Sequence, residues 1–297
     1  ALDWPFQEIT LDYGPLARLP NRLSGASLTG LTPDARVAFR PPWPDVVLAA
    51  GRRTAPAALW VKRQKPDVFL CQLMRPGMAL GRFGLCAIPA HDRPPIRPNV
   101  LETLGAPHRV TPLALERAAL GAETLFPGLP RPFWGVLMGG DSKHGPFTAR
   151  DGARLGHSMA AFAARNGGSL LVTTSRRTGG EALAALRQAL APAPHFLWPW
   201  QPEGLNPYLP ILGVSDALIV TEESVAMLSE TMATGRALYA FPFLRGRPFK
   251  GFHDVLVQKG ILRWLPADGR HDPWNFPPVL EAERVAGAIR TLSGLED

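Results

Sequence analysis

The sequence predicts an α/β protein of two domains, each a parallel β-sheet covered by helices on both faces. The chain has 297 residues, enough for two domains of roughly 150 residues each. Apolar runs of five to seven residues alternate with helical patterns, as expected for strands that are buried on both faces. The alternation restarts after Arg131-Pro132. We therefore expect one Rossmann-like domain over residues 1–130 and a second over residues 131–297.

Composition excludes several other classes of protein. Hydrophobic residues make up 46% of the chain and charged residues 19%, which allows a large core and excludes a disordered or collagen-like chain. No run approaches the roughly 18 apolar residues of a membrane span, so we expect a cytoplasmic protein, with a peripheral membrane or protein partner left open. The opening residues, Ala1-Leu2-Asp3-Trp4-Pro5, resemble the middle of a fold. We expect the first domain to lack its initial strand-helix unit.

The net charge and the cysteine and histidine content limit which partners, metals and cofactors we expect. The formal net charge is +7 and comes mostly from Arg, yet no block of five like charges occurs, which argues against a nucleic-acid partner. Short pairs such as Arg176-Arg177 leave local anion sites open. Cys71 and Cys86 lie in apolar stretches and are expected to be buried, reduced thiols. The seven His are dispersed and no Asp-x-Asp pair occurs, so we expect no metal site and no cofactor.

The elements follow in order from these patterns. In the first half, the helix after Gly51 turns Ala55 and Leu59 inward, and Thr111-Pro112 starts a second helix, because Thr can cap a helix and Pro suits its first turn. The strands of this half are residues 6–11, 45–49, 67–73 and 83–88, with a short strand and turn in 99–110. In the second half, the strands are 133–138, 169–173, 195–197, 217–220 and 237–241, and the helices are 148–164, 180–190, 206–214, 224–233, 251–259 and 280–292.

Polar residues follow five of the predicted strands. In an open parallel sheet, ligands bind beyond the carboxyl ends of the strands. Glycine turns and helix N-termini offer unpaired N–H groups there, and hydroxyl and guanidinium groups add donors, which suits a phosphate-bearing ligand in an interdomain cleft. The candidate residues are Gly51, Arg52, Arg53 and Thr54 in the first domain, and Gly139, Gly140, Ser142, Lys143, Ser175, Arg176, Arg177, Thr178, Thr221 and Ser224 in the second.

Each of these loops also has a plainer interpretation. Gly139-Gly140 lacks the spacing of a P-loop and of a G-x-G-x-x-G turn, so a tight strand-to-helix connection explains it nearly as well. Arg176 and Arg177 favour an anion over a solvated turn, because adjacent cations beside three hydroxyls are costly to crowd without one. A catalytic base could be His91 or His144, but a surface or capping His is the more frequent case. The catalytic residues stay unknown.

One stretch resembles a known family. It runs from Asn206-Pro207-Tyr208 through Thr221-Glu222-Glu223-Ser224 to Ser229-Glu230 and is similar to the signature of the mitochondrial-fission ELM family. The resemblance extends back through residues 174–178, 139–142, 107–112 and 49–54, and so covers nearly the whole chain. Members are bacterial proteins of unsettled activity and plant proteins needed for mitochondrial division. The family usually has an earlier strand–Gly–helix unit, which this sequence lacks at its start.

The ELM family in turn resembles GT-B glycosyltransferases, which have two Rossmann-like domains and bind a nucleotide-sugar mainly in the second. Residues 229–238 are similar to a stretch of the peptidoglycan N-acetylglucosaminyltransferases, in which a Glu matching Glu230 takes the ribose hydroxyls. A carboxylate can accept both hydroxyl protons of a cis-diol while the diphosphate lies at the glycine turn and a helix N-terminus. The plainer interpretation of Glu230 is a solvated side chain on a helix.

The sequence departs from the family where Glu222-Glu223 stands in place of x-Asp. Two acids in the first turn of a helix repel a phosphate there, so we expect the diphosphate nearer to Gly140 and Arg177 than to Thr221. The resemblance implies a metal-independent GT-B-type glycosyltransferase that takes a nucleotide-diphosphate sugar and an unknown acceptor. Two alternatives stay open, a nucleotide-sugar epimerase on the same fold and a non-catalytic adaptor of the ELM type.

Overall fold

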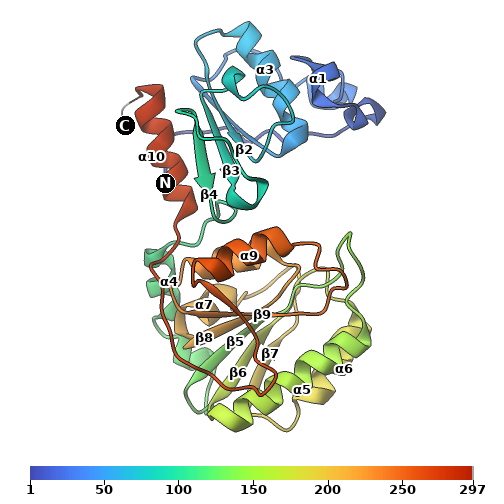
Figure 1. Ribbon diagram of the computed structural model, residues 1–297, viewed down its shortest axis with the longest axis vertical. Helices are drawn as coiled ribbons and strands as arrows, with labels where there is room; N and C mark the ends of the chain where they lie inside the picture. Colours follow the sequence, from blue (N-terminus) through green and yellow to red (C-terminus); the bar gives the residue numbers. More distant parts are fainter. Residues whose placement is uncertain (296–297) are drawn as a thin grey trace. The chain divides into compact units, whose positions relative to one another are not determined.

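The computed structural model describes residues 1–295, which fall into two compact units (Figure 1). The first unit contains Ala1–Thr103 together with the C-terminal segment from Glu281, and the second contains Leu104–Leu280. Residues 104–130, which the sequence analysis placed in the first domain, pack with the second unit, and the last helix packs with the first. The predicted α/β class is confirmed, because each unit is built on a parallel sheet.

The first unit has four parallel strands in the order β1-β2-β3-β4. Neighbouring residues along a strand point to opposite faces, so Leu70 packs against helix α3 while Cys71 packs against helix α10. Cys71 and Cys86 are buried free thiols, and burial raises their pKa values to about 12 and about 11. The elements are β1 (Val46–Ala50), β2 (Phe69–Leu73), β3 (Leu85–Pro89), β4 (Val100–Thr103), α1 (Asn21–Ser24), α2 (Pro33–Arg36), α3 (Ala55–Gln64), α10 (Glu281–Ser293) and the 3₁₀ helices η1 (Pro15–Arg18), η2 (Arg52–Thr54), η3 (Leu80–Arg82) and η4 (Ala90–Asp92).

The predicted strand at residues 6–11 was wrong. The structure gives this segment no strand pairing, and nearly all of its side chains are exposed, Phe6 by 82%. The apolar positions of the segment resemble a strand, but no neighbouring strand supplies backbone partners. The short helices α1 and α2 were not predicted, because their four residues are too few to show a helical period.

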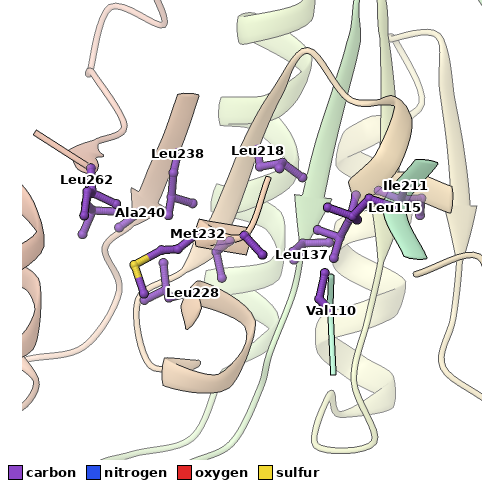
Figure 2. Packing of buried hydrophobic residues seen from close by; sticks show 14 of the residues in the cluster. Val110, Leu115, Leu137, Ile211, Leu218, Leu228, Met232, Leu238, Ala240 and Leu262 are labelled. Carbon is purple, nitrogen blue, oxygen red and sulfur yellow. The ribbon is translucent and has the colours of Figure 1, made fainter. Parts of the chain in front are cut away.

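The second unit has six parallel strands in the order β10-β9-β8-β5-β6-β7. Helices α5 and α6 cover one face of this sheet, and α4, α7, α8 and α9 cover the other. Figure 2 shows the second of these layers, where Leu228 and Met232 of α8 lie close to Leu238 and Ala240 of β9. The elements are β5 (Phe133–Leu137), β6 (Ser169–Thr173), β7 (His195–Trp198), β8 (Ala217–Thr221), β9 (Ala237–Phe241), β10 (Leu262–Trp264), α4 (Pro112–Ala119), α5 (Ala149–Asn166), α6 (Gly180–Leu190), α7 (Tyr208–Val214), α8 (Val225–Met232), α9 (Lys250–Gln258) and the 3₁₀ helix η5 (Ala122–Leu125).

Local sequence explains where α5 begins and how closely it packs. The Thr148 hydroxyl accepts the Asp151 N–H, and the Asp151 carboxylate accepts the Thr148 N–H, so a capping box starts the helix. Gly152 and Gly156 then let α5 lie directly against α6, because a Cβ at Gly152 would stand 2.2 Å from the carbonyl oxygen of Ala182. This pair of helices covers the apolar side chains on one face of the sheet.

Candidate functional site

The strand order of the second sheet marks the place where a ligand would bind. Strand β5 lies at the centre, β6 and β7 extend to one side, and β8, β9 and β10 extend to the other. In such doubly wound sheets, ligands occupy the crevice beyond the carboxyl ends of the two strands where the order reverses. These strands are β5 and β8. Gly139 and Gly140 follow β5, and Thr221 is the last residue of β8, so the structure brings these predicted residues together.

The glycine turn after β5 is closed by side chains from β8 and the residues that follow it. The N–H of Gly139 donates to the Thr221 hydroxyl at 2.9 Å, and the N–H of Gly140 donates to Oε1 of Glu223 at 2.7 Å. A Cβ at residue 139 would lie 1.8 Å from Oε1 of Glu223, so glycine lets this carboxylate approach the turn. Gly140 has φ +155° and would place a Cβ 2.3 Å from the Arg177 carbonyl oxygen. Both amides that the sequence offered to a phosphate are therefore engaged by the protein itself.

Glu223 is the charged group at the centre of this site. Its carboxylate is fully buried, and Oε2 has no hydrogen-bond partner among the described residues. The guanidinium of Arg177 lies 3.6 Å from Oε1. Burial raises the pKa of Glu223, while the Gly140 N–H, Thr221 and Arg177 pull that pKa in the opposite direction. A buried carboxylate here takes the position and the donors that an anionic ligand would use.

The loop after β6 is folded onto the same glycine turn. The hydroxyls of Ser175 and Thr178 both donate to the Gly139 carbonyl oxygen, at 2.7 and 2.5 Å. Arg177 donates through Nη1 to the Asp141 carbonyl oxygen at 2.5 Å. These contacts hold the loop after β6 against the glycine turn. They also place Arg177 next to Glu223.

Three groups at this edge remain oriented toward solvent. Arg176 is exposed, and so is Lys143 at the tip of a turn closed by hydrogen bonds between Ser142 and Gly145. Helix α6 begins directly after the loop with Gly179 at its N-cap, where no side chain caps the first N–H groups. Exposed cations beside an uncapped helix N-terminus form the part of this edge that suits an anion best.

The two acids after β8 stand before helix α8 rather than in its first turn, because α8 begins at Val225. Ser224 is buried at the N-cap position and makes no side-chain cap. Glu222 is engaged in holding the chain after β9, since its Oε1 accepts the N–H groups of Phe243 and Leu244 at 2.6 and 2.5 Å. Of these two acids, only Glu223 contacts the glycine turn.

Glu230 lies on α8 in a cluster of titratable groups. The hydroxyl of Tyr208 donates to its Oε2, and the half-buried ring of His108 lies close enough for the Glu230 charge to act on it. Burial lowers the pKa of His108 and raises that of Tyr208 well above its usual value, so near neutral pH both are uncharged neighbours. In the sequence, Tyr208 stood out only as part of the family resemblance, and His108 only within the matching residues 107–112. The Asn-Pro-Tyr run before a helix was the signal that pointed to Tyr208.

In the first unit, the predicted residues lie at the carboxyl end of β1. Gly51 turns the chain with φ +87°, the Thr54 hydroxyl and the Gln72 amide both donate to its carbonyl oxygen, at 2.8 and 3.0 Å, and helix α3 follows. The guanidinium of Arg53 stacks over the Tyr13 ring at 4.4 Å, and Arg52 is exposed. This edge presents the positive charge of two exposed Arg side chains.

The two histidines considered as bases are placed differently. The His144 ring packs edge-on against Phe249 with centroids 4.9 Å apart, in the loop that follows the glycine turn. His91 lies in the first unit, with Nε2 at 3.9 Å from a carboxylate oxygen of Asp92. Within residues 1–295, no group of three His, Cys, Asp or Glu residues is arranged to hold a metal ion. None of the helices in that range is long and apolar enough to cross a membrane.

Comparison with known proteins extends over the whole chain. The family model described as mitochondrial fission ELM1 matches residues 1–292. The chain is 26% identical to the mitochondrial fission protein ELM1 of Arabidopsis thaliana over 290 residues, which covers 89% of this chain and 67% of that protein. It is 24% identical to the uncharacterized protein RP120 of Rickettsia prowazekii (strain Madrid E) over 322 residues, which covers 96% and 90%.

Among solved structures, the UDP-GlcNAc 2-epimerase of Methanocaldococcus jannaschii shares the fold. The TM-score is 0.50 at 12% sequence identity, with 85% of this chain and 77% of the epimerase covered. The likeness concerns the arrangement of two parallel sheets and their helices, which is the GT-B-like architecture that the sequence predicted.

Proposed function

Because the chain belongs to the mitochondrial fission ELM1 family, we propose that it binds a nucleotide-diphosphate sugar at the carboxyl edge of the second sheet and acts as a glycosyltransferase. One observation carries the proposal. At the carboxyl edge of the sheet, where the strand order reverses, the glycine turn, the Arg176-Arg177 loop and the residues just before α8 contact one another. The epimerase with a similar fold is named for UDP-GlcNAc, a ligand of this class.

The contacts at this edge suggest how the ligand would be arranged. The diphosphate would lie at Arg176, Lys143 and the uncapped start of α6, because Glu223 already holds the Gly140 amide. Arg177 would turn from Glu223 toward the diphosphate when the ligand enters. The ribose would lie at Glu230, whose carboxylate is oriented by Tyr208 and can accept hydroxyl protons.

This arrangement favours departure of the nucleotide diphosphate. Cations and amide donors aimed at the diphosphate stabilise the negative charge that grows on it as the sugar bond breaks. A base that deprotonates the acceptor hydroxyl completes a glycosyl transfer. We assign no residue to that role.

A thermal-shift panel of nucleotides and nucleotide-diphosphate sugars tests the proposal. Binding to the folded state raises the melting temperature by mass action, so we expect at least one nucleotide-diphosphate sugar to stabilise the protein. An unchanged melting temperature with every member of the panel, each at millimolar concentration, would contradict the proposal. Mononucleosides without phosphate serve as the control and should have little effect.

The two alternative functions, epimerase and adaptor, predict different experimental results. An epimerase converts a bound nucleotide sugar to its isomer with no acceptor present, which proton NMR of the incubated sugar detects. An adaptor binds its partner equally well when Arg176 and Arg177 are replaced by Ala. A glycosyltransferase shows neither behaviour.

A further inference from the structure

A cavity lies at the edge of the second sheet opposite to the candidate nucleotide site. It has a volume of about 900 Å³ and opens at the amino ends of β5, β8 and β9, where Trp134, Asp216 and Ala237 line it. The candidate nucleotide site stands at the carboxyl ends of the same strands, so the sheet itself separates the two. Nothing in the proposed function uses this cavity.

Among the charged side chains that line the cavity, positive ones outnumber negative ones. Arg131 and Arg236 both line it, against the single carboxylate of Asp216. Oδ2 of Asp216 is already occupied, because it accepts the Phe133 N–H at 2.7 Å and an Arg131 N–H at 3.4 Å. The carboxylate therefore offsets at most one of the two guanidinium charges.

Arg236 keeps unused donors beside this cavity. Its Nη1 donates to the carbonyl oxygens of Leu212 and Ser215 at the end of α7, at 3.3 and 2.5 Å. Its Nε and Nη2 bond to none of the residues that the structure describes. A guanidinium has five N–H donors in a fork that matches a carboxylate or a phosphate. Half-buried N–H donors without acceptors favour binding of an anion, because its oxygen atoms can accept their hydrogen bonds.

Part of the cavity wall is aromatic. Trp134, Trp274 and His271 line it, with the His271 ring edge-on to Trp134 at 5.0 Å between centroids. Burial lowers the pKa of His271, so at neutral pH its ring is an uncharged surface. The guanidinium of Arg263 stacks on the Trp274 ring at 4.0 Å and helps to fix its position. Flat apolar walls next to unpaired donors fit a ligand with a flat body and one anionic group.

We propose that this cavity is a second ligand site, which binds a small aromatic anion through Arg131 and Arg236 and holds its ring against Trp274 and His271. The carboxylate or phosphate of the ligand accepts from the unused guanidinium donors. The ring replaces water along the aromatic wall. The shared chemistry is an anionic group on a planar apolar body, and the two anion types are separated by the probes below.

Titration of the full chain with phenyl phosphate and with benzoate, followed by tryptophan fluorescence and by thermal shift, tests the site. We expect saturable binding of at least one of them, with weaker binding of inorganic phosphate and none of benzyl alcohol, because the site needs both the charge and the ring. Arg131→Ala should weaken binding at least tenfold. Its side chain is 51% exposed, so its removal should leave the fold intact.

Arg165→Ala is the matched control, since Arg165 is 52% exposed and forms a comparable ion pair with Asp268 outside the cavity. Trp274→Leu is the second variant and should reduce affinity for the aromatic anions but not for inorganic phosphate. Absence of saturable binding by both aromatic anions would overturn the proposal. Equal affinities in Arg131→Ala and Arg165→Ala would also overturn it. Loss of binding in Arg176→Ala/Arg177→Ala instead would place the probe at the nucleotide edge and would overturn the proposal as well.

Discussion

The carboxylate of Glu223 takes the backbone N–H that an anion would need at the glycine turn. It accepts that N–H at 2.7 Å while its other oxygen stays buried without a partner among the described residues. An unpaired buried carboxylate oxygen costs about 1–3 kcal/mol or more. The unpaired oxygen therefore costs stability, and the same carboxylate would compete with an anionic ligand for the Gly140 N–H; both effects can be measured.

Glu223→Gln should raise the affinity for a nucleotide diphosphate severalfold. The amide keeps an acceptor for Gly140, but it no longer holds Arg177 or repels phosphate. Titration calorimetry of both proteins at pH 7 measures the change. Equal or weaker binding by the Gln variant would show that the Glu223 charge does not compete with the ligand.

The same substitution should change how stability depends on pH. Because the pKa of Glu223 is raised in the folded state, its contribution to stability is full below the unfolded pKa of about 4.3 and is lost as pH rises through the folded value. The wild type should therefore lose stability relative to Glu223→Gln between about pH 4 and neutrality. Melting temperatures of the two proteins across this range give the difference, and a constant difference would contradict the assignment.

Tyr208→Phe should weaken ribonucleotide binding through its effect on Glu230. The variant removes the hydroxyl that orients the carboxylate, so affinity should fall by about 0.5–1.5 kcal/mol. Glu230→Gln should cost about 1–3 kcal/mol. Dideoxyribonucleotides lack the hydroxyls in question and should bind both variants as well as the wild type. If the two ligand types lose affinity equally, Glu230 does not contact the ribose.

Residue types at strand ends could be predicted from sequence, but their partners could not. Gly139, Ser175 and Thr221 stand at strand ends because apolar runs end there. The bond between Gly140 and Glu223 joins residues 83 apart, and it exists only because β5 and β8 are neighbours in the sheet. No local sequence pattern reveals that pairing. The hydrogen bond that engages the Gly140 N–H could therefore be seen only in the structure.

Single elements show the same balance between local sequence and packing. Helix α5 was predicted nearly correctly, because Thr148 and Asp151 mark its start and its apolar positions recur with a helical period. Strand β10 has only three residues and an exposed Arg263, so its sequence carries no strand pattern. It forms because β9 offers it a free edge.

The contact between α5 and α6 yields a stability prediction. Ala has a higher helix propensity than Gly by about 1 kcal/mol, yet Gly152→Ala should destabilise the protein because the Cβ would stand 2.2 Å from the Ala182 carbonyl oxygen. Gly287→Ala is the matched control in α10, where no atom lies within 4 Å of the added Cβ, and it should stabilise by up to about 1 kcal/mol. Urea unfolding of both variants measures the two effects. The same sign for both would contradict the packing argument.

At the scale of the whole molecule, the chain leaves its first unit at Thr103 and returns to it at Glu281. This return could not be predicted from the sequence, because the last helix directly follows the second sheet along the chain. Its partners, Cys71, Leu85 and Ala87, lie about 200 residues earlier. Amphipathic periodicity predicts that a helix exists but does not say which sheet it covers.

Removal of α10 should therefore expose the first unit and spare the second. A chain that ends at Leu280 should show a rapidly reacting Cys71 thiol, because α10 packs over it, while Cys86 on the α3 face stays protected. Reaction with a thiol reagent and mass mapping distinguishes the two cysteines. Protection of both would mean that α10 does not cover this face, and rapid reaction of both would mean that the unit has unfolded.

The central claim is that the carboxyl edge of the second sheet binds a nucleotide-diphosphate sugar, and calorimetry tests it most directly. The ligand is the nucleotide-diphosphate sugar that stabilises the protein most in the panel, and the proteins are the wild type, Arg176→Ala/Arg177→Ala, and Arg187→Ala as an exposed control in α6. We predict that the double variant loses about 1.5–3 kcal/mol for each charged hydrogen bond removed, while Arg187→Ala binds like the wild type. Unchanged affinity in the double variant would contradict the claim.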